Sequence, residues 1–322
     1  MRDYRFDNIK ACLMLLVVFG HFLEIVPGHQ FLYLFIYTFH MPVFIFLSGY
    51  FARFDRKKLV FGLILPYFIF QTLYRCFDAW VLKSTEVELI YTRPWWITWY
   101  LLTLIVYYLL IPFIDVEKET HRVLIFGASI ILSLLAGFDT SVGYAMSLSR
   151  IASFLPFFVA GFYLRKEGEI RQPDRWIKGG FSVFVTLVTV FVLSSGEISK
   201  KMLYDSYSYE AADYSAGIKA MLMIIAFAWV IVWLWIAPQK YIPIFSEIGR
   251  YTMPVFLLHG FPVKMFGKLV STGAITLDIG DALLITLCLI FILGNKYSNE
   301  VFCNLFTWQW LWKKKRRTLS KS

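Results

Sequence analysis

The chain has 322 residues, of which 58% are hydrophobic, 19% aromatic and 17% charged, and its formal net charge is +10. Soluble domains are about 45–50% apolar and about 25% charged, so this composition excludes an ordinary soluble protein. The Lys and Arg residues lie mainly between long apolar segments, so membrane topology explains the positive charge better than nucleic-acid binding does.

Apolar segments long enough to cross a membrane recur along the whole sequence. A transmembrane helix needs about 20 mainly apolar residues. We therefore predict an all-α, polytopic integral membrane protein with about ten transmembrane helices. In chain order, the predicted spans are residues 9–25, 34–51, 59–80, 95–113, 123–138, 151–164, 177–194, 218–235, 253–266 and 282–293. The sixth, ninth and tenth spans are short, which favours a tilted or broken helix there.

The distribution of positive charge predicts the orientation and the domain plan. If the N-terminus is cytoplasmic, most of the 32 Lys and Arg residues fall in cytoplasmic segments, including the "KKKRR" run at 313–317. Such an excess marks the cytoplasmic side, so we expect both termini inside and the polar segment 195–216 outside. Residues 1–312 are expected to form a single membrane-embedded domain, and residues 313–322 a basic cytoplasmic tail.

The first span, "NIKACLMLLVVFGHF", carries Lys10 and His21 on one helix face. Eleven residues at 100° each come within about 20° of three full turns, and the two positions are about 16 Å apart along the axis. Asp7 and Glu24 extend the same stripe by one turn at either end. Ionisable residues within a span are functional candidates by default. The structural alternative is a Lys that reaches the interface and a His that bonds to a neighbouring helix, and it stays open.

The second predicted span, "FHMPVFIFLSGYFARFDRKK", carries a second histidine and ends in a basic cluster. His40 lies at a depth similar to that of His21 if the two helices are antiparallel. The cluster lies on the same side as Lys10 and consists of Arg53, Arg56, Lys57 and Lys58. Cations suit phosphate groups, and a neutral imidazole suits general-base catalysis.

These two segments resemble the opening spans of the acyltransferase-3 family of integral-membrane acyltransferases, and more narrowly its fucose 4-O-acetylase-like branch. The family's basic residue and histidine, separated by ten intervening residues, are matched by Lys10 and His21, and its Leu-Ser-Gly motif ends here at Ser48-Gly49. "PWWITWYLLTL" and "YTMPVFLLHGF" resemble its Trp-rich fourth span and its His-bearing segment near the end. Lys10 replaces the commoner Arg, which keeps the charge but loses the bidentate fork.

The resemblance implies that an acyl group, usually acetyl, passes from cytoplasmic acyl-CoA to a hydroxyl of a sugar or cell-envelope glycan. We expect catalytic roles for His21, His40 and Glu24. We expect donor contacts from Lys10, Ser48, Gly49, Arg53, Arg56 and Lys57. We expect acceptor contacts from Trp96, Trp99 and His259. His21 either deprotonates the acceptor hydroxyl or briefly carries the acyl group, and the sequence does not separate these routes.

Each of these residues also has a structural interpretation. The tryptophans suit an interfacial aromatic belt, Ser48-Gly49 suits close helix packing, and His259 suits a packed core histidine. The four cysteines show no metal-type or redox-type spacing, so no metal is expected. The expected partners are acyl-CoA as a substrate, a sugar or glycan acceptor and the lipid bilayer, without nucleic acid or a permanently bound cofactor. We expect the plasma membrane of a bacterium, and leave a homodimer open.

Two other functions compete with acyl transfer. A proton-coupled transporter or flippase of an anionic or glycan substrate would use His21 and His40 as a proton relay. A non-catalytic partner of a glycan-assembly complex would need neither histidine for chemistry. Neither alternative explains why the Lys10–His21 spacing, the Leu-Ser-Gly motif and the basic residues Arg53 and Arg56 occur together. Binding and turnover of acyl-CoA without an ion gradient would separate the three.

Overall fold

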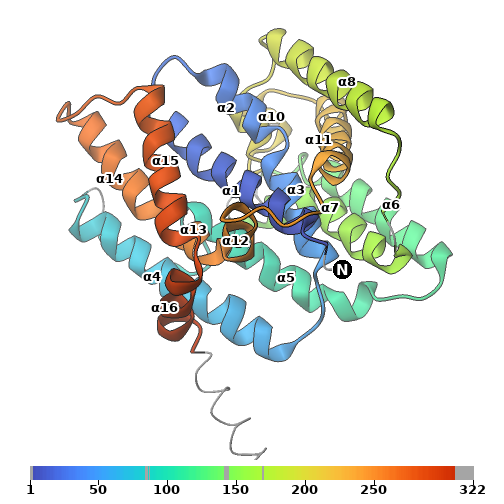
Figure 1. Ribbon diagram of the computed structural model, residues 1–322, viewed down its shortest axis with the longest axis horizontal. Coiled ribbons are helices and arrows are strands. Elements are labelled where there is room, and N and C mark those ends of the chain that lie inside the picture. Colours follow the sequence, from blue (N-terminus) through green and yellow to red (C-terminus); the bar gives the residue numbers. More distant parts are fainter. Residues whose placement is uncertain (1–2, 84–85, 87, 141–144, 169, 309–322) are drawn as a thin grey trace, which may run out of the picture.

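A computed structural model describes residues 3–83, 86, 88–140, 145–168 and 170–308 (Figure 1). These residues form helices and connecting segments, with no β-strand among them, which confirms the all-α prediction. The helices are α1 (Arg5–Leu23), α2 (Gln30–Tyr37), α3 (His40–Tyr50), η1 (Lys58–Ile64), α4 (Leu65–Trp80), η2 (Trp96–Thr98), α5 (Trp99–Ile114), α6 (Glu119–Leu135), η3 (Ala145–Ser147), α7 (Leu148–Glu167), α8 (Arg175–Ser194), α9 (Lys200–Leu203), α10 (Tyr209–Ala212), α11 (Ala216–Ile236), α12 (Phe245–Arg250), α13 (Thr252–Leu258), α14 (Gly260–Ser271), α15 (Ile279–Leu293) and α16 (Lys296–Phe306). The basic tail expected at 313–322 lies outside the described residues.

Within the described residues, six helical segments are long and apolar enough to cross a membrane. They are Arg5–Leu23, Gln30–Tyr50, Lys58–Trp80, Trp96–Ile114, Arg175–Ser194 and Ala216–Ile236. The pair α15 and α16 adds a seventh if the two helices, bent by 70°, form one span. The chain is therefore a multi-pass membrane protein with six or seven candidate spans, and the count of about ten stays a prediction.

The other three predicted spans are present as helices, but their length or polarity differs from that of a regular span. Helix α6 has 17 residues, and α7 carries Arg165 and Lys166 in its last turn. The predicted ninth span is divided between α13 and α14, which have 7 and 12 residues. Short or charged helices of this kind fail a simple criterion of length and hydropathy.

Helix α1 lies in the middle of the molecule (Figure 1) and packs against α2, α3, α11, α12, α13 and α15. Its apolar residues Ile9, Leu13, Val18 and Phe22 are fully buried by these neighbours. A helix that is apolar on all sides is suited to this central position. The helix that carries Lys10 and His21 therefore lies in the protein interior.

Proline residues follow the helix breaks at both additional histidines, which are buried. Pro42 has no N–H to bond the carbonyl of Thr38, and the helix is interrupted at Thr38–Phe39, just before His40. Pro262 likewise has no N–H to bond the carbonyl of Leu258, four residues earlier, where α13 ends. His259 lies at this break, between α13 and α14.

Helices α3 and α7 approach each other closely through two glycines. A Cβ atom on Gly49 would overlap the carbonyl oxygen of Phe158, and one on Gly161 would overlap that of Phe46. Small residues at such positions let membrane helices pack backbone to backbone. Gly49 therefore has a packing role.

The outer helices present apolar side chains away from the protein. On α8, at the periphery of Figure 1, Trp176, Phe184 and Phe191 are 77%, 62% and 80% exposed. Large apolar surfaces that face outward indicate contact with a membrane rather than with water.

Candidate active site

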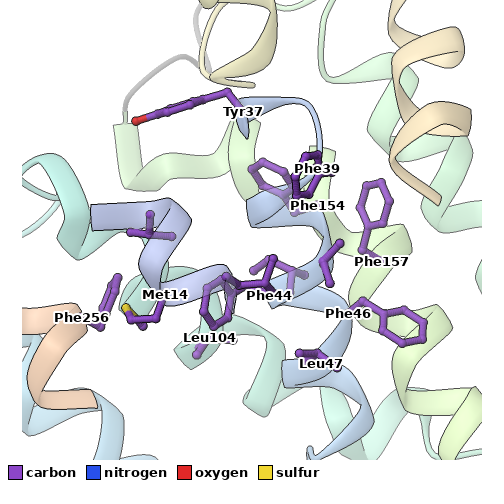
Figure 2. Packing of buried hydrophobic residues seen from close by; sticks show 14 of the residues in the cluster. Met14, Tyr37, Phe39, Phe44, Phe46, Leu47, Leu104, Phe154, Phe157 and Phe256 are labelled. Atoms are coloured by element: carbon purple, nitrogen blue, oxygen red, sulfur yellow. The ribbon is translucent and has the colours of Figure 1, made fainter. Parts of the chain in front are cut away.

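A cavity of about 570 Å³ lies between α1, α3, η1, α5, α13 and α16, and we call it the Lys10 cavity. Its wall is largely apolar, and Met14, Phe44, Leu104 and Phe256, which Figure 2 shows converging from four helices, contribute to it. Lys10 supplies a positive charge to this apolar wall.

Lys10 forms an ion pair with Asp7, at 2.9 Å, one turn earlier on α1. Its ammonium also lies 5.7 Å from the centre of the Phe51 ring. Lys58 is the second cation of the Lys10 cavity and lies 5.0 Å from the Tyr108 ring centre. The stripe of Asp7 and Lys10 that the sequence predicts is therefore present.

The remaining donor-site candidates differ in position. Ser48 lines the Lys10 cavity, and its hydroxyl donates to the carbonyl of Phe44 at 2.9 Å and accepts from the hydroxyl of Tyr100 at 2.7 Å. Gly49 instead faces α7. The other three candidates are exposed on the segment between α3 and η1, beside Lys58, and are Arg53, Arg56 and Lys57.

A second cavity, of about 300 Å³, lies farther along α1 and brings together five of the predicted catalytic and acceptor residues. We call it the His21 cavity, and the five are His21, Glu24, His40, Trp96 and Trp99. The sixth, His259, is buried and stacks on the His21 ring at a centroid distance of 5.5 Å.

A chain of hydrogen bonds fixes the protonation pattern of His21. The hydroxyl of Tyr37 donates to Oε1 of Glu24 at 3.0 Å and lies 3.1 Å from Nδ1 of His21. Because a hydroxyl has a single proton and Tyr37 donates it to Glu24, the Tyr37 oxygen can only accept a hydrogen bond from His21. Nδ1 of His21 therefore carries the proton, and Nε2 is the basic nitrogen. Figure 2 shows the Tyr37 hydroxyl pointing away from the apolar cluster.

Glu24 is held in place by a second tyrosine pair. Tyr33 donates to Oε1 of Glu24 at 3.0 Å, and its hydroxyl lies 2.6 Å from that of Tyr204. Tyr204 is therefore the donor to Tyr33. Oε1 also lies 3.6 Å from Nδ1 of His21. This network anchors the carboxylate behind the histidine, an arrangement known from catalytic histidines oriented by an acidic partner.

The two other histidines adopt matching tautomers. Nδ1 of His40 bonds the carbonyl of Ile36, and Nδ1 of His259 bonds that of Val255, both at 2.9 Å. A carbonyl oxygen only accepts, so Nδ1 carries the proton in each ring and Nε2 is an acceptor. Within the described part of the chain, Nε2 of His259 is buried without a hydrogen-bond partner.

Trp96 is held against His21 by a fully buried glutamine. Gln71 donates to the carbonyls of Ile90 and Arg93 and accepts from the backbone of Trp95 and the side chain of Thr98. All four of its hydrogen-bonding positions are therefore used. The loop that it fixes gives Trp96 a φ of 40° and a ring contact with His21 at 4.6 Å.

Four residues belong to both cavities, namely Val17, Met41, Tyr100 and Phe256. The Lys10 and His21 cavities are therefore neighbours with a shared wall. Val17 lies one turn before His21 on α1, so the shared wall lies beside the histidine.

The sequence did not identify three residues that complete the His21 cavity. They are Tyr37, Arg150 and Lys264. Arg150 and Lys264 fall among the few cations outside the predicted cytoplasmic segments, which was a usable signal. No sequence pattern marked Tyr37, because its place in the site depends on hydrogen bonds to His21 and Glu24 at the other end of a loop.

The fold and the site together identify the general class of this protein. The chain is a polytopic helical membrane protein with a hydrogen-bonded histidine that lines one of two neighbouring cavities. A family model described as an acyltransferase domain matches residues 3–295, nearly the whole chain, and the protein belongs to this acyltransferase family. Neither a curated protein nor a solved structure was found to match it.

Proposed function

We propose that the protein is an O-acyltransferase of a bacterial plasma membrane, which moves an acyl group, most simply acetyl, from cytoplasmic acyl-CoA to a sugar or cell-envelope glycan. The fucose 4-O-acetylase-like branch, the ten-span topology and the cytoplasmic termini belong to this proposal. The observation that carries it is that His21 lines a cavity that shares a wall with a second cavity, which contains Lys10 and Lys58.

The donor is assigned to the Lys10 cavity. Lys10 and Lys58 would bind phosphate groups of CoA, with Arg53 and Arg56 beside them on the adjoining exposed segment. The apolar wall suits the pantetheine arm, which would extend along α1 toward the shared wall. The distance of about 16 Å from Lys10 to His21 suits the two ends of one extended molecule.

The acceptor is assigned to the His21 cavity. Nε2 of His21 would take the proton of a sugar hydroxyl while the oxygen of that hydroxyl attacks the thioester carbonyl carbon. The C–S bond then breaks, and the CoA thiolate leaves and takes up a proton. Transient acylation of His21 would give the same products in two steps. Tyr37 and Glu24 would hold the ring and stabilise its positive charge.

The test uses purified protein in lipid nanodiscs, without any gradient, and measures CoA release from acetyl-CoA. We expect turnover by the wild type and a loss of about 10²–10⁴-fold in His21→Ala, with acetyl-CoA affinity nearly unchanged. Lys10→Ala should instead mainly raise the donor KM, and Lys10→Arg should be tolerated. His121→Ala, on the exposed surface of α6, is the matched control. Substantial turnover in His21→Ala would refute the proposal.

The shared wall between the two cavities also favours a second candidate, a proton-coupled transporter or flippase. In that case the shared wall would open as a gate, and His21 and His40 would carry protons. A transporter should show substrate uptake that depends on a proton gradient in liposomes, and no release of CoA from acetyl-CoA.

A further inference from the structure

Among the described residues, the wall shared by the Lys10 and His21 cavities contains one hydroxyl group, which belongs to Tyr100. The other three residues of the wall are apolar, and they are Val17, Met41 and Phe256. In the proposed function, the donor occupies one cavity and the acceptor the other, so the thioester and the attacking hydroxyl meet at this wall. Tyr100 is therefore the residue of the wall that can donate a hydrogen bond to the reacting acyl group.

The Tyr100 hydroxyl is held on the donor side of this wall. It lies 2.7 Å from Oγ of Ser48, which lines the Lys10 cavity. The ring of Tyr100 packs edge-on against that of Phe256, with 5.1 Å between the ring centres. Ser48 belongs to α3 and Phe256 to α13, so two helices fix the side chain. The hydroxyl therefore has a defined position at the wall.

The two hydroxyl groups can reverse the direction of their hydrogen bond. Ser48 donates to the carbonyl of Phe44 at 2.9 Å while it accepts from Tyr100. Rotation of the Ser48 hydroxyl hydrogen directs the same proton at the Tyr100 oxygen instead. The carbonyl of Phe44 lies within α3 and keeps the helical bond from the N–H of Ser48, four residues later. Tyr100 can then donate its own proton to a substrate without leaving either hydroxyl unpaired.

The proposed acyl transfer requires a hydrogen-bond donor at the thioester carbonyl. As the acceptor oxygen forms its bond to the carbonyl carbon, an electron pair moves to the carbonyl oxygen, and it returns when the C–S bond breaks. Preorganised donors at such an oxyanion are usually the largest single contribution to catalysis. His21 is assigned to the acceptor proton, and Lys10, about 16 Å away along α1, to phosphate groups. Neither residue therefore stabilises the carbonyl oxygen.

We propose that Tyr100 is a further catalytic residue, whose hydroxyl donates a hydrogen bond to the thioester carbonyl oxygen and stabilises its negative charge. Ser48 is the positioning residue that orients this hydroxyl. The inference rests on the proposed function, because it assigns a group to the same reaction. The Tyr100 proton stays on the tyrosine throughout, so the bonds formed and broken in the acyl transfer are unchanged.

The first measurement is kcat for CoA release from acetyl-CoA by the full chain in lipid nanodiscs. Tyr100→Phe should lower kcat by about 10²–10³-fold, as the loss of one oxyanion donor does, with acetyl-CoA affinity nearly unchanged. Ser48→Ala should lose less, because Tyr100 keeps its hydroxyl. Tyr107→Phe is the matched control on α5, since its hydroxyl bonds the carbonyl of Ile151 at 2.7 Å, outside both cavities. It should retain kcat.

The second measurement does not depend on turnover. Acetyl-dethia-CoA is a ketone analogue in which a methylene group replaces the sulfur, and its isotope-labelled carbonyl can be followed by infrared spectroscopy. A hydrogen bond weakens the C=O bond, so the carbonyl band should lie at higher wavenumber in Tyr100→Phe than in the wild type. Tyr107→Phe should match the wild type.

An unchanged carbonyl band or a retained kcat in Tyr100→Phe would overturn the proposal. Loss of analogue binding in Tyr100→Phe would make Tyr100 a binding or structural residue, and would overturn it as well. In contrast, a wild type that releases no CoA from acetyl-CoA would refute the proposed function. The two failures are therefore distinguishable.

Discussion

At the scale of single residues, the position of His21 depends on hydrogen bonds that come from another helix. Tyr37 links Nδ1 of His21 to Glu24, so one hydroxyl group determines both the tautomer and the orientation of the ring. A histidine that works as a base needs its reactive nitrogen unprotonated and directed at the substrate. In the proposed mechanism, Tyr37 is therefore a positioning residue.

The first prediction concerns this hydroxyl group. Tyr37→Phe keeps the ring but removes both hydrogen bonds, and we expect kcat for CoA release to fall by about 10–100-fold, as for histidines that lose an outer hydrogen-bond partner in metal sites. The KM for acetyl-CoA should stay nearly constant, because Tyr37 does not line the Lys10 cavity. Tyr33→Phe, which leaves the bonds of Tyr37 intact, is the control and should lose less. An unchanged kcat in Tyr37→Phe would show that the hydrogen-bond chain does not orient His21.

At the scale of helices, small residues decide how closely α3 and α7 approach. Gly49 and Gly161 face carbonyl groups of the opposite helix, so each contact tolerates no side chain. This packing positions His40 and Arg150 on the two helices, at the same end of the bundle.

The second prediction tests this packing. Gly49→Ala should lower the free energy of unfolding by about 1–3 kcal/mol, the usual cost of overpacking, since the new methyl group would meet the backbone of Phe158. The measurement is thermal unfolding in detergent. Gly127→Ala on α6 is the matched control, because a Cβ there meets nothing within 4 Å, and it should be neutral or stabilising. Equal stability of the two variants would contradict the close contact.

The sequence predicted the helices well and the contacts between them only in part. Long apolar runs mark α1, α5 and α11, and the helical period alone placed Lys10 and His21 on one face.

The contacts of Tyr37, Gln71 and Arg150 could not be predicted, because each joins segments distant in the sequence. The number of membrane spans is equally hard to derive. Helices such as α7 bury polar residues, including Ser149 and Ser153, against neighbouring helices. A hydropathy profile contains no information about these neighbours, so it does not identify such a helix as a membrane span.

At the scale of the whole molecule, the proposed reaction requires the two cavities to open on opposite sides of the membrane. The charge distribution predicts that the Lys10 end lies in the cytoplasm and α10 outside. Orientation is therefore a condition of the mechanism, since acyl-CoA is available only in the cytoplasm.

The third prediction tests this orientation in intact cells with a membrane-impermeant maleimide. In a cysteine-free background, a cysteine at exposed Glu210 on α10 should be labelled, and one at exposed Glu117 before α6 should be protected until the membrane is opened. Labelling at both positions after permeabilisation is the control for accessibility. The reverse pattern would place the cationic cavity on the side that lacks CoA.

The wall formed by Val17, Met41, Tyr100 and Phe256 also bears on the electrical balance of the proposed reaction. The acceptor loses its proton at His21 on one side of this wall, and the leaving CoA thiolate gains a proton on the other. When the same proton is returned, a proton moves inward while the acyl group moves outward without the electron pair of its C–S bond, which stays on sulfur. The two displacements carry equal charge in opposite directions, so each turnover transfers no net charge across the membrane. The thioester alone therefore drives the proposed acyl transfer, and a membrane potential should leave its rate unchanged, in contrast to the rate of a proton-coupled transporter.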